Sequence, residues 1–217
     1  DRKIISFTKN PLEKSNLIGE LFTSISQKQV IELQYHKFES TNELLSVNLC
    51  PYLLKEYNRR WYVIGQTETG SKLLNFSLDR IDKVIPLLSH NYIEYEGDIN
   101  EFFDDIIGVT NYDEISVETI LFWVSDISKD FVASKPLHDS QRHYKGKAEN
   151  EYRELYPSLA GGCFFSIQCK ENYELIRELC SFGENLIVLL PNNIREKVAE
   201  RIHKMKTIYN SIKSTNI

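Results

Sequence analysis

The stretch NRRWYVIGQTE, residues 58–68, decides how the first half of the chain is interpreted. Aromatic and β-branched residues in series predict a largely buried strand. Alternate side chains of a strand point to opposite faces, so Arg60 and Tyr62 share one face and Trp61 and Val63 share the other. If Trp61 and Val63 enter the core, the pair formed by Arg60 and Tyr62 is a candidate binding site.

The sequence on either side of this stretch predicts a helix followed by short strands. Apolar residues spaced three and four apart predict an amphipathic helix over residues 11–28, and the alternation in VIELQYHKF predicts a half-buried strand. Pro51 and Pro86 are expected at strand starts or breaks, because proline lacks an N–H. Further strand candidates are ELLSVNLC, YLLKEY, RWYVIGQTE, KLLNFSL and KVIPLL. Short antiparallel strands after a helix favour a small barrel, because closure removes exposed edges.

The second half of the chain has a different pattern of predicted elements, in which strands alternate with helices. Residues 98–107 predict another amphipathic helix with Asp98 as its N-cap, and GVTNYDE predicts a linker. The strands ISVETILFWV, GGCFFSIQC and NLIVLLP then alternate with the helical segments DISKDFVAS, NYELIRELCSF and NNIREKVAERIHKMKTIYNSI. This alternation favours an α+β unit of the ferredoxin-like kind. We therefore expect a helix and barrel over 1–97, a linker helix over 98–113 and an α+β domain over 114–217.

The composition excludes several classes of function. A net charge of -5 argues against a positive electrostatic field over the whole surface that would attract nucleic acid. No apolar run approaches the roughly 20 residues of a membrane span. The four cysteines show neither CxxC pairs nor metal-ligand spacing, which favours a reducing cytoplasm. His138 and His143 lie in a presumed loop without a companion carboxylate motif, and Gly161–Gly162 is interpreted as a turn before a strand. With no nucleophile elbow, HExxH or phosphate-binding loop, we expect no enzyme, no cofactor and no metal.

Basic and aromatic residues are interleaved along the barrel strands. The basic ones are Arg59, Arg60, Arg80, Lys55, Lys72 and Lys83, and the aromatic ones are Tyr35, Tyr52, Tyr57, Trp61, Tyr62 and Phe76. Small barrels use this combination to bind single-stranded nucleic acid, with bases stacked on rings and phosphates held by arginine. In the alternative, Trp61 and Phe76 fill the barrel core. Arg80 then pairs with a neighbouring aspartate, Asp79 or Asp82, and composition alone favours this second interpretation.

The last helix carries a heptad-like seam. Its members, at spacings of four, three, four and three, are Val198, Ile202, Met205, Tyr209 and Ile212. A seam of about two heptads is too short to establish a coiled coil. It either packs within the chain, which is the interpretation we favour, or meets a second copy.

Several motifs together resemble a known family. RRWYVIG followed by NFSLDRIDKV, with IELQY and CPYLLKEY before them, resembles the motif pair of WYL-domain proteins. PLHDSQ and ELCSFGENLIVLLPNNIREKVAERI look like the C-terminal extension called WCX. The resemblance spans about residues 12 to 205. It implies an Sm/SH3-like β-barrel followed by a ferredoxin-like α+β module.

The resemblance also implies a function. WYL-domain proteins are mostly bacterial transcription regulators, usually homodimers, with a winged helix-turn-helix N-terminal to the barrel. The chain begins with Asp1, so we expect it to be a fragment whose first twelve residues are the tail of a connector. Operator DNA would then be bound by a domain absent from this chain. The barrel would sense a nucleotide, single-stranded nucleic acid or another anionic effector in the cytoplasm.

The resemblance assigns pocket positions one by one. They are Tyr35 in the first strand, Arg60 and Tyr62 in the name motif, and Arg80 in LDRI. Family members often read Arg-x-Phe-Arg just before LDRI, whereas this chain has Leu74-Asn75-Phe76-Ser77, so Ser77 stands at a pocket position that is usually basic. Fewer cations neutralise fewer phosphates, which favours a smaller anionic or polar ligand. The alternative to a sensor is a protein-interaction and dimerisation scaffold.

Overall fold

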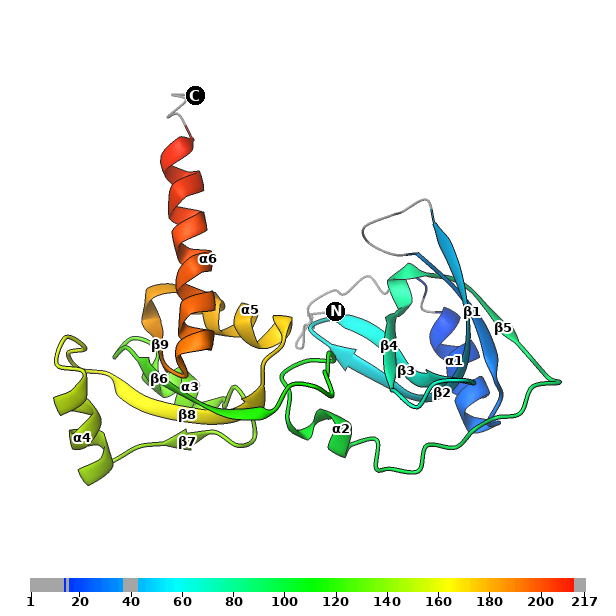
Figure 1. Cartoon of the computed structure of the whole chain (residues 1–217), viewed down its shortest axis with the longest axis horizontal. Coiled ribbons are helices and arrows are strands. Elements are labelled where there is room, and N and C mark those ends of the chain that lie inside the picture. The colour runs from blue at the N-terminus through cyan, green and yellow to red at the C-terminus, as the bar shows by residue number, and fades with distance from the viewer. Residues whose placement is uncertain (1–13, 15, 37–42, 213–217) are drawn as a thin grey trace, which may run out of the picture. The chain divides into compact units, whose positions relative to one another are not determined.

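The computed structural model describes residues 14, 16–36 and 43–212, so the predicted connector tail lies outside the described residues. The chain forms two compact units, residues 1–99 and residues 100–217, each built around an antiparallel sheet (Figure 1). The two units are described separately below. The mixture of helix and strand confirms the predicted α+β class.

Unit 1 is a helix followed by a five-stranded antiparallel sheet in the order β4-β3-β2-β1-β5. Its elements are α1 (Asn16–Ser26), β1 (Ile31–His36), β2 (Leu44–Tyr57), β3 (Arg60–Thr67), β4 (Leu74–Ser77), the 3-10 helix η1 (Leu78–Arg80) and β5 (Ile81–Pro86). Among the described residues no pairing joins the outer strands β4 and β5, so a closed barrel stays a prediction.

The core of unit 1 lies between α1 and one face of the sheet. Leu17 and Leu21 of α1 pack against buried strand residues that include Val63. Trp61 is partly buried and packs against the same cluster. The face assignment expected for residues 58–68 is therefore confirmed, and Arg60 and Tyr62 lie on the other face.

Pro51 is the main departure from the expected strands. The two candidates ELLSVNLC and YLLKEY form one strand, β2, and Pro51 lies inside it instead of breaking it. The pairing with β3 shifts register between Pro51 and Leu53, which is a bulge that accommodates a residue without an N–H. Opposite Pro51 stands Gly65, where a Cβ would come within 2.3 Å of the Cys50 carbonyl oxygen.

Unit 2 has the ferredoxin-like topology. Its elements are α2 (Glu101–Asp104), β6 (Val117–Val124), α3 (Lys129–Ser134), β7 (Arg142–His143), α4 (Lys147–Leu155), β8 (Cys163–Lys170), α5 (Tyr173–Ser181), the 3-10 helix η2 (Gly183–Asn185), β9 (Leu186–Leu190) and α6 (Asn192–Ser211). The sheet order β7-β8-β6-β9 is that of a βαββαβ unit, with α4 inserted between β7 and β8 and α6 added after β9.

Two segments of unit 2 differ from expectation. The helix predicted over residues 98–107 is only α2, and it starts after Asn100, so Asp98 is not the N-cap. The chain leaves the helix at Asp105, whose carbonyl accepts a hydrogen bond from the Lys170 amide at the end of β8. The helix α4 was not anticipated, because its sequence is dominated by charged residues.

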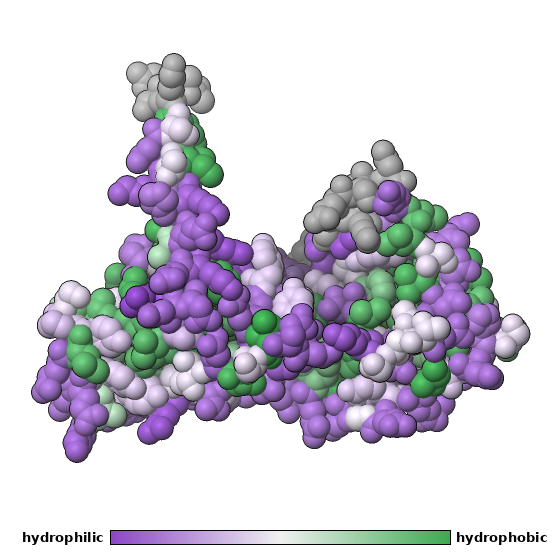
Figure 2. Space-filling view, viewed as in Figure 1, coloured by the Kyte–Doolittle hydropathy of each residue, from purple (hydrophilic) through white to green (hydrophobic). Residues whose placement is uncertain are grey.

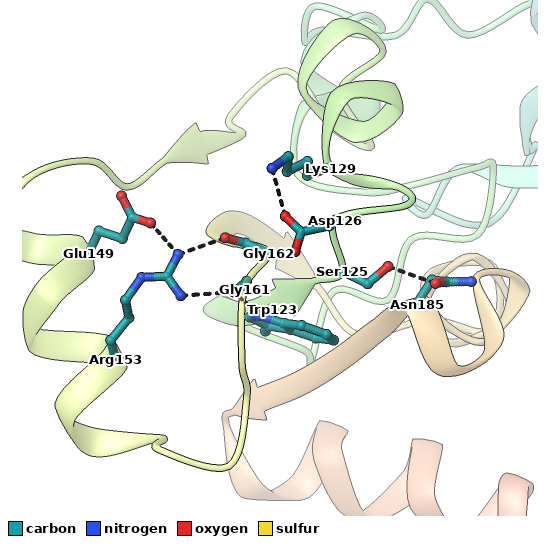
Figure 3. A network of polar contacts seen from close by, with 9 residues as sticks. All are labelled: Trp123, Ser125, Asp126, Lys129, Glu149, Arg153, Gly161, Gly162 and Asn185. Atoms are coloured by element: carbon teal, nitrogen blue, oxygen red, sulfur yellow. Dashed lines mark hydrogen bonds and ion pairs between the residues drawn. The ribbon is translucent and has the colours of Figure 1, made fainter.

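The glycine pair before β8 is a turn whose carbonyl groups are held by side chains (Figure 3). Gly161 and Gly162 have φ of 65° and 61°, the left-handed region that glycine tolerates. Arg153 of α4 donates to the carbonyl of Gly161 at 2.8 Å and to that of Gly162 at 2.7 Å, and it pairs with Glu149 at 2.5 Å. Trp123 adds a hydrogen bond to Gly161 at 3.1 Å. These contacts give the turn a structural role.

Candidate ligand site

The predicted pocket residues lie in two groups in unit 1, with Tyr62 beside Ser77 on one face of the sheet and Arg80 beside Tyr35, whose ring belongs to the core cluster on the other face. Tyr62 on β3 lies directly opposite Ser77 on β4. After Ser77 the chain turns through η1, which ends at Arg80. The Arg80 guanidinium carbon lies 4.5 Å from the centre of the Tyr35 ring, and its Nε donates to the carbonyl of His36 at 2.8 Å. Two contacts thus fix the orientation of the Arg80 guanidinium.

The other pocket arginine forms an ion pair. Arg60 Nε lies 3.1 Å from Oδ2 of Asp79, with 45% and 27% of the two side chains exposed. A pair this exposed contributes little to stability. Arg59 lies outside the strand, in the turn that precedes it, with φ of 65° and an exposed side chain. The two neighbouring arginines are therefore separated, as the strand alternation predicts.

Three buried polar atoms beside these arginines have no hydrogen-bond partner among the described residues. They are Ser77 Oγ, Asp79 Oδ1 and His36 Nδ1. Ser77 is only 4% exposed, so water does not solvate its hydroxyl freely. A buried polar group without a partner costs about 1–3 kcal/mol. An unpaired buried polar atom calls for an explanation, and a bound ligand is one of them.

The site also contains a purely structural ring. Phe76 is 8% exposed and meets Tyr35 edge-on, with ring centres 5.1 Å apart. Phe76 therefore fills the core, as the alternative interpretation anticipates, and it holds the Tyr35 ring beneath Arg80. The same interpretation expected Arg80 to pair with Asp79 or Asp82, and the structure pairs Asp79 with Arg60.

Sequence reasoning did not include Asp79 or His36 in the site. Asp79 belongs to the LDRI motif, so its position next to Arg80 in the sequence could have placed it in the site. Its carboxylate determines the net charge of the site. Two guanidinium groups and one carboxylate leave a local charge of about +1. Such a site suits a ligand that combines an anionic group with N–H or O–H donors, which Asp79 can accept.

The other chemically suggestive residues have ordinary roles. His138 Nδ1 lies 2.7 Å from Ser140 Oγ, and the His143 ring stacks on Phe165 at 4.4 Å. Burial lowers the pKa of His143. Within the described ranges, no group of three or more His, Cys, Asp or Glu side chains could hold a metal ion. No helix in the part of the chain that the structure describes is long and apolar enough to cross a membrane.

Comparison with solved structures gives two distant likenesses. One is Proteasome accessory factor B/C (PafBC) of Arthrobacter aurescens, at 14% identity and a TM-score of 0.35, over 95% of this chain and 29% of that chain. The other is a CRISPR Cas-related protein, at 13% identity and a TM-score of 0.51, over 89% of this chain and 51% of that chain. The TM-score of 0.51 shows that this chain and the second protein share a fold. This chain spans at most about half of either protein.

Comparison with protein families assigns both units. The family model of the WYL domain matches residues 16–86, which cover α1 and the sheet of unit 1. The family model of the WCX domain matches residues 141–206 in unit 2. No curated protein matches the chain. The order of the two domains is the one that the sequence motifs predict, and the chain belongs to the family of proteins in which a WYL domain is followed by a WCX domain.

Proposed function

We propose that the chain is the effector-sensing and dimerising part of a WYL-type bacterial transcription regulator that works in the cytoplasm. Operator DNA is bound by a helix-turn-helix domain outside this chain, and an effector held by unit 1 controls that binding. One observation supports the sensor above all. Buried polar atoms of Ser77, Asp79 and His36 lack partners among the described residues, beside the arginines Arg60 and Arg80.

The site chemistry favours a small effector over a long polyanion. Leu74 and Ser77 stand where basic residues would add two phosphate contacts, and Asp79 adds a negative charge. Each missing cation lowers affinity for a nucleic-acid strand at physiological salt. A nucleotide-like molecule matches better, because its phosphate suits Arg80 and its base carries N–H donors for the Asp79 carboxylate.

The test compares binding of a labelled mononucleotide and a labelled short single-stranded DNA to the parent chain and to variants. We expect Arg80→Ala to weaken nucleotide binding about tenfold or more, because a charged hydrogen bond is worth roughly 1.5–3 kcal/mol. Arg60→Ala should weaken binding in the same direction. Arg59→Ala is the matched control, since it removes the same charge from the neighbouring turn and should leave affinity near that of the parent.

The same titrations at several salt concentrations separate the two effectors. Binding of a single strand changes with salt by about 0.7 log units per neutralised phosphate for each tenfold change, so one or two contacts give a shallow slope. A parent chain that binds neither probe would contradict the effector class. Equal affinity of the parent, Arg60→Ala and Arg80→Ala would contradict the site.

The alternative function is a protein-interaction scaffold without a sensor. The ion pair of Arg60 with Asp79 supports it, because a paired arginine is also a common structural element. A scaffold predicts that both arginine variants keep every interaction of the parent. It predicts self-association that no nucleotide changes.

A further inference from the structure

A bulge in β2 places one tyrosine beside the segment that follows the sheet of unit 1. The pairing of β2 with β3 shifts register between Pro51 and Leu53, so Tyr52 is the extra residue that the ladder skips. Bulges of this kind redirect a side chain and often lie next to functional sites. After β5 the chain runs without helix or strand along unit 1 as far as residue 99 (Figure 1). We call residues 87–99 the strap.

Hydrogen bonds fasten the strap to the bulge. The Tyr52 hydroxyl donates to the carbonyl of Ile93 at 2.7 Å, and the Tyr92 hydroxyl donates to the carbonyl of Pro51 at 2.7 Å. The Ile93 amide donates to Cys50 Sγ at 3.4 Å. These contacts fix two tyrosine rings that meet at 85°, with centres 5.8 Å apart. The protein itself therefore holds both rings in place, which lowers the entropic cost of binding a ligand against them.

A third tyrosine extends the aromatic wall. The Tyr95 ring lies 5.8 Å from the ring of Tyr52, at an angle of 37°. Gly97 leaves room for it, because a Cβ at that position would come within 3.0 Å of the Tyr95 ring. The three tyrosines line a cavity of about 360 Å³ within unit 1, together with Ile25 from the end of α1. A cavity of this size is typical of a site for a small molecule.

The charged side chains of the cavity make it slightly negative. Lys28 and Glu94 form an ion pair at 2.6 Å, and Asp98 lines the same cavity. One cation and two carboxylates give a net charge of about -1. The phenol groups add no charge, because burial raises the pKa of both Tyr52 and Tyr92, the latter to about 12.

We propose that this cavity is a second binding site of unit 1, which takes the quaternary ammonium group of a small free molecule. The negative face of an aromatic ring attracts a cation, and a quaternary ammonium group needs no hydrogen bond from the site. The carboxylates of Glu94 and Asp98 favour the positive charge and disfavour an anion beside it. The cavity shares no residue with the effector site of Arg60 and Arg80, so this inference goes beyond the proposed function and does not depend on it.

Titration calorimetry of the full chain with choline tests the site. We expect choline to bind the parent chain measurably, and to slow hydrogen exchange in the strap. The matched control ligand is the neutral isostere of choline, in which carbon replaces nitrogen. It should bind at least about tenfold more weakly, because it fills the same volume without the charge that the rings attract. Equal affinity for the two ligands would overturn a cation site.

Tyr95 is the ring to remove, because the hydroxyls of Tyr52 and Tyr92 also anchor the strap. Tyr95→Leu should weaken choline binding by about three- to tenfold, the usual effect of one cation–π contact. Tyr95→Phe keeps the ring and should keep most of the affinity. Choline that binds Tyr95→Leu as tightly as the parent would overturn the assignment of the cavity.

A second pair of variants tests the charge. Asp98→Asn removes a carboxylate from the cavity and should weaken choline binding about threefold. Glu96→Gln removes the same charge from an exposed position of the strap outside the cavity lining, and should bind choline as the parent does. Equal losses in the two variants would overturn the argument from charge.

The remaining probes separate the sources of the ammonium group and the two sites. Phosphocholine carries a phosphate beside the same ammonium group, and the cavity carboxylates should make it bind more weakly than choline. Tighter binding of phosphocholine would overturn a free cation and favour a lipid headgroup. Arg80→Ala should bind choline as the parent does while it loses nucleotide affinity. A parent that binds no choline would overturn this inference and leave the proposed function standing.

Discussion

Replacing Ser77 with alanine should stabilise unit 1, although most buried substitutions destabilise a protein. The Ser77 hydroxyl is buried at 4% exposed and has no hydrogen-bond partner among the described residues. Ser77→Ala removes one oxygen atom and with it the desolvation cost of that hydroxyl. A buried unpaired polar group costs about 1–3 kcal/mol, so we expect a gain of about 1–2 kcal/mol.

The gain should be measured by hydrogen exchange with mass spectrometry on the full chain. A single unfolding free energy is poorly defined for a chain of two units, whereas exchange reports each unit separately. The slowest amides of β3 and β4 should exchange about 5- to 30-fold more slowly in Ser77→Ala. Amides of unit 2 should be unchanged.

Ser166 provides a matched control in the sheet of unit 2. It is also a buried serine in a strand, at 5% exposed, but its hydroxyl lies 3.0 Å from the Tyr144 hydroxyl. Ser166→Ala removes that hydrogen bond, so it should destabilise unit 2 by about 1 kcal/mol. The two substitutions remove the same atom and should move stability in opposite directions.

Faster exchange in Ser77→Ala would refute the reasoning, because it would mean that the hydroxyl contributes a hydrogen bond within the protein. The same variant also bears on function. If Ser77 Oγ is kept unpaired for an effector, Ser77→Ala should weaken nucleotide binding while it stabilises the fold. A more stable protein with unchanged affinity would remove Ser77 from the site.

Two further predictions concern unit 2. Gly162→Ala should cost about 3 kcal/mol or more, since a Cβ there would lie 2.2 Å from the Val124 carbonyl oxygen at a φ of 61°. Gly183→Ala, with a φ of 57° and open space, should cost only about 1 kcal/mol. Hydrogen exchange of unit 2 checks both, and equal costs would contradict the close approach. Burial raises the pKa of the Cys169 thiol to about 12, above its unfolded value of about 8.5, so its contribution to stability is complete below pH 8.5 and is lost as pH rises towards 12. The free energy of unfolding of unit 2, measured between pH 7 and 10, should therefore fall more steeply with pH for the parent than for Cys169→Ala. Identical slopes would contradict the prediction.

The strands and their faces could be predicted because alternation is a local signal. Trp61 and Val63 both face the core because side chains two residues apart on a strand lie on the same face. Pro51 was misjudged because its tolerance depends on a bulge opposite Gly65 on another strand. The helix α4 was missed because charged residues dominate its sequence, and the ring of Tyr152 within it meets Tyr144 at 5.0 Å and Phe164 at 5.5 Å.

The candidate site was predictable to a different extent. A resemblance of motifs identified Tyr35, Arg60, Tyr62, Ser77 and Arg80, and the sheet brings Tyr62 opposite Ser77 and Arg80 over Tyr35. The ion-pair partner of Arg60 could not be read from alternation. The 3-10 turn η1 interrupts the period of two and brings the Asp79 carboxylate back towards β3. The absence of hydrogen-bond partners is a property of the folded surroundings, which no local pattern contains.

Each unit leaves one feature unsatisfied within the described residues. In unit 1 the polar atoms around Ser77 lack hydrogen-bond partners among the described residues, and in unit 2 the large apolar side chains of α6 from Ile202 to Ile212 are at least half exposed (Figure 2). Packing of the whole seam within the chain, which we expected, is therefore wrong beyond Val198. Folded proteins usually pair their buried polar atoms and bury their large apolar side chains. Exceptions occur mainly where a ligand or a partner completes the structure. The two features differ in chemistry. The polar atoms of unit 1 need hydrogen bonds and charge, whereas the apolar side chains of α6 need apolar contacts. A small polar effector can therefore satisfy only the first, whereas the second requires an apolar surface.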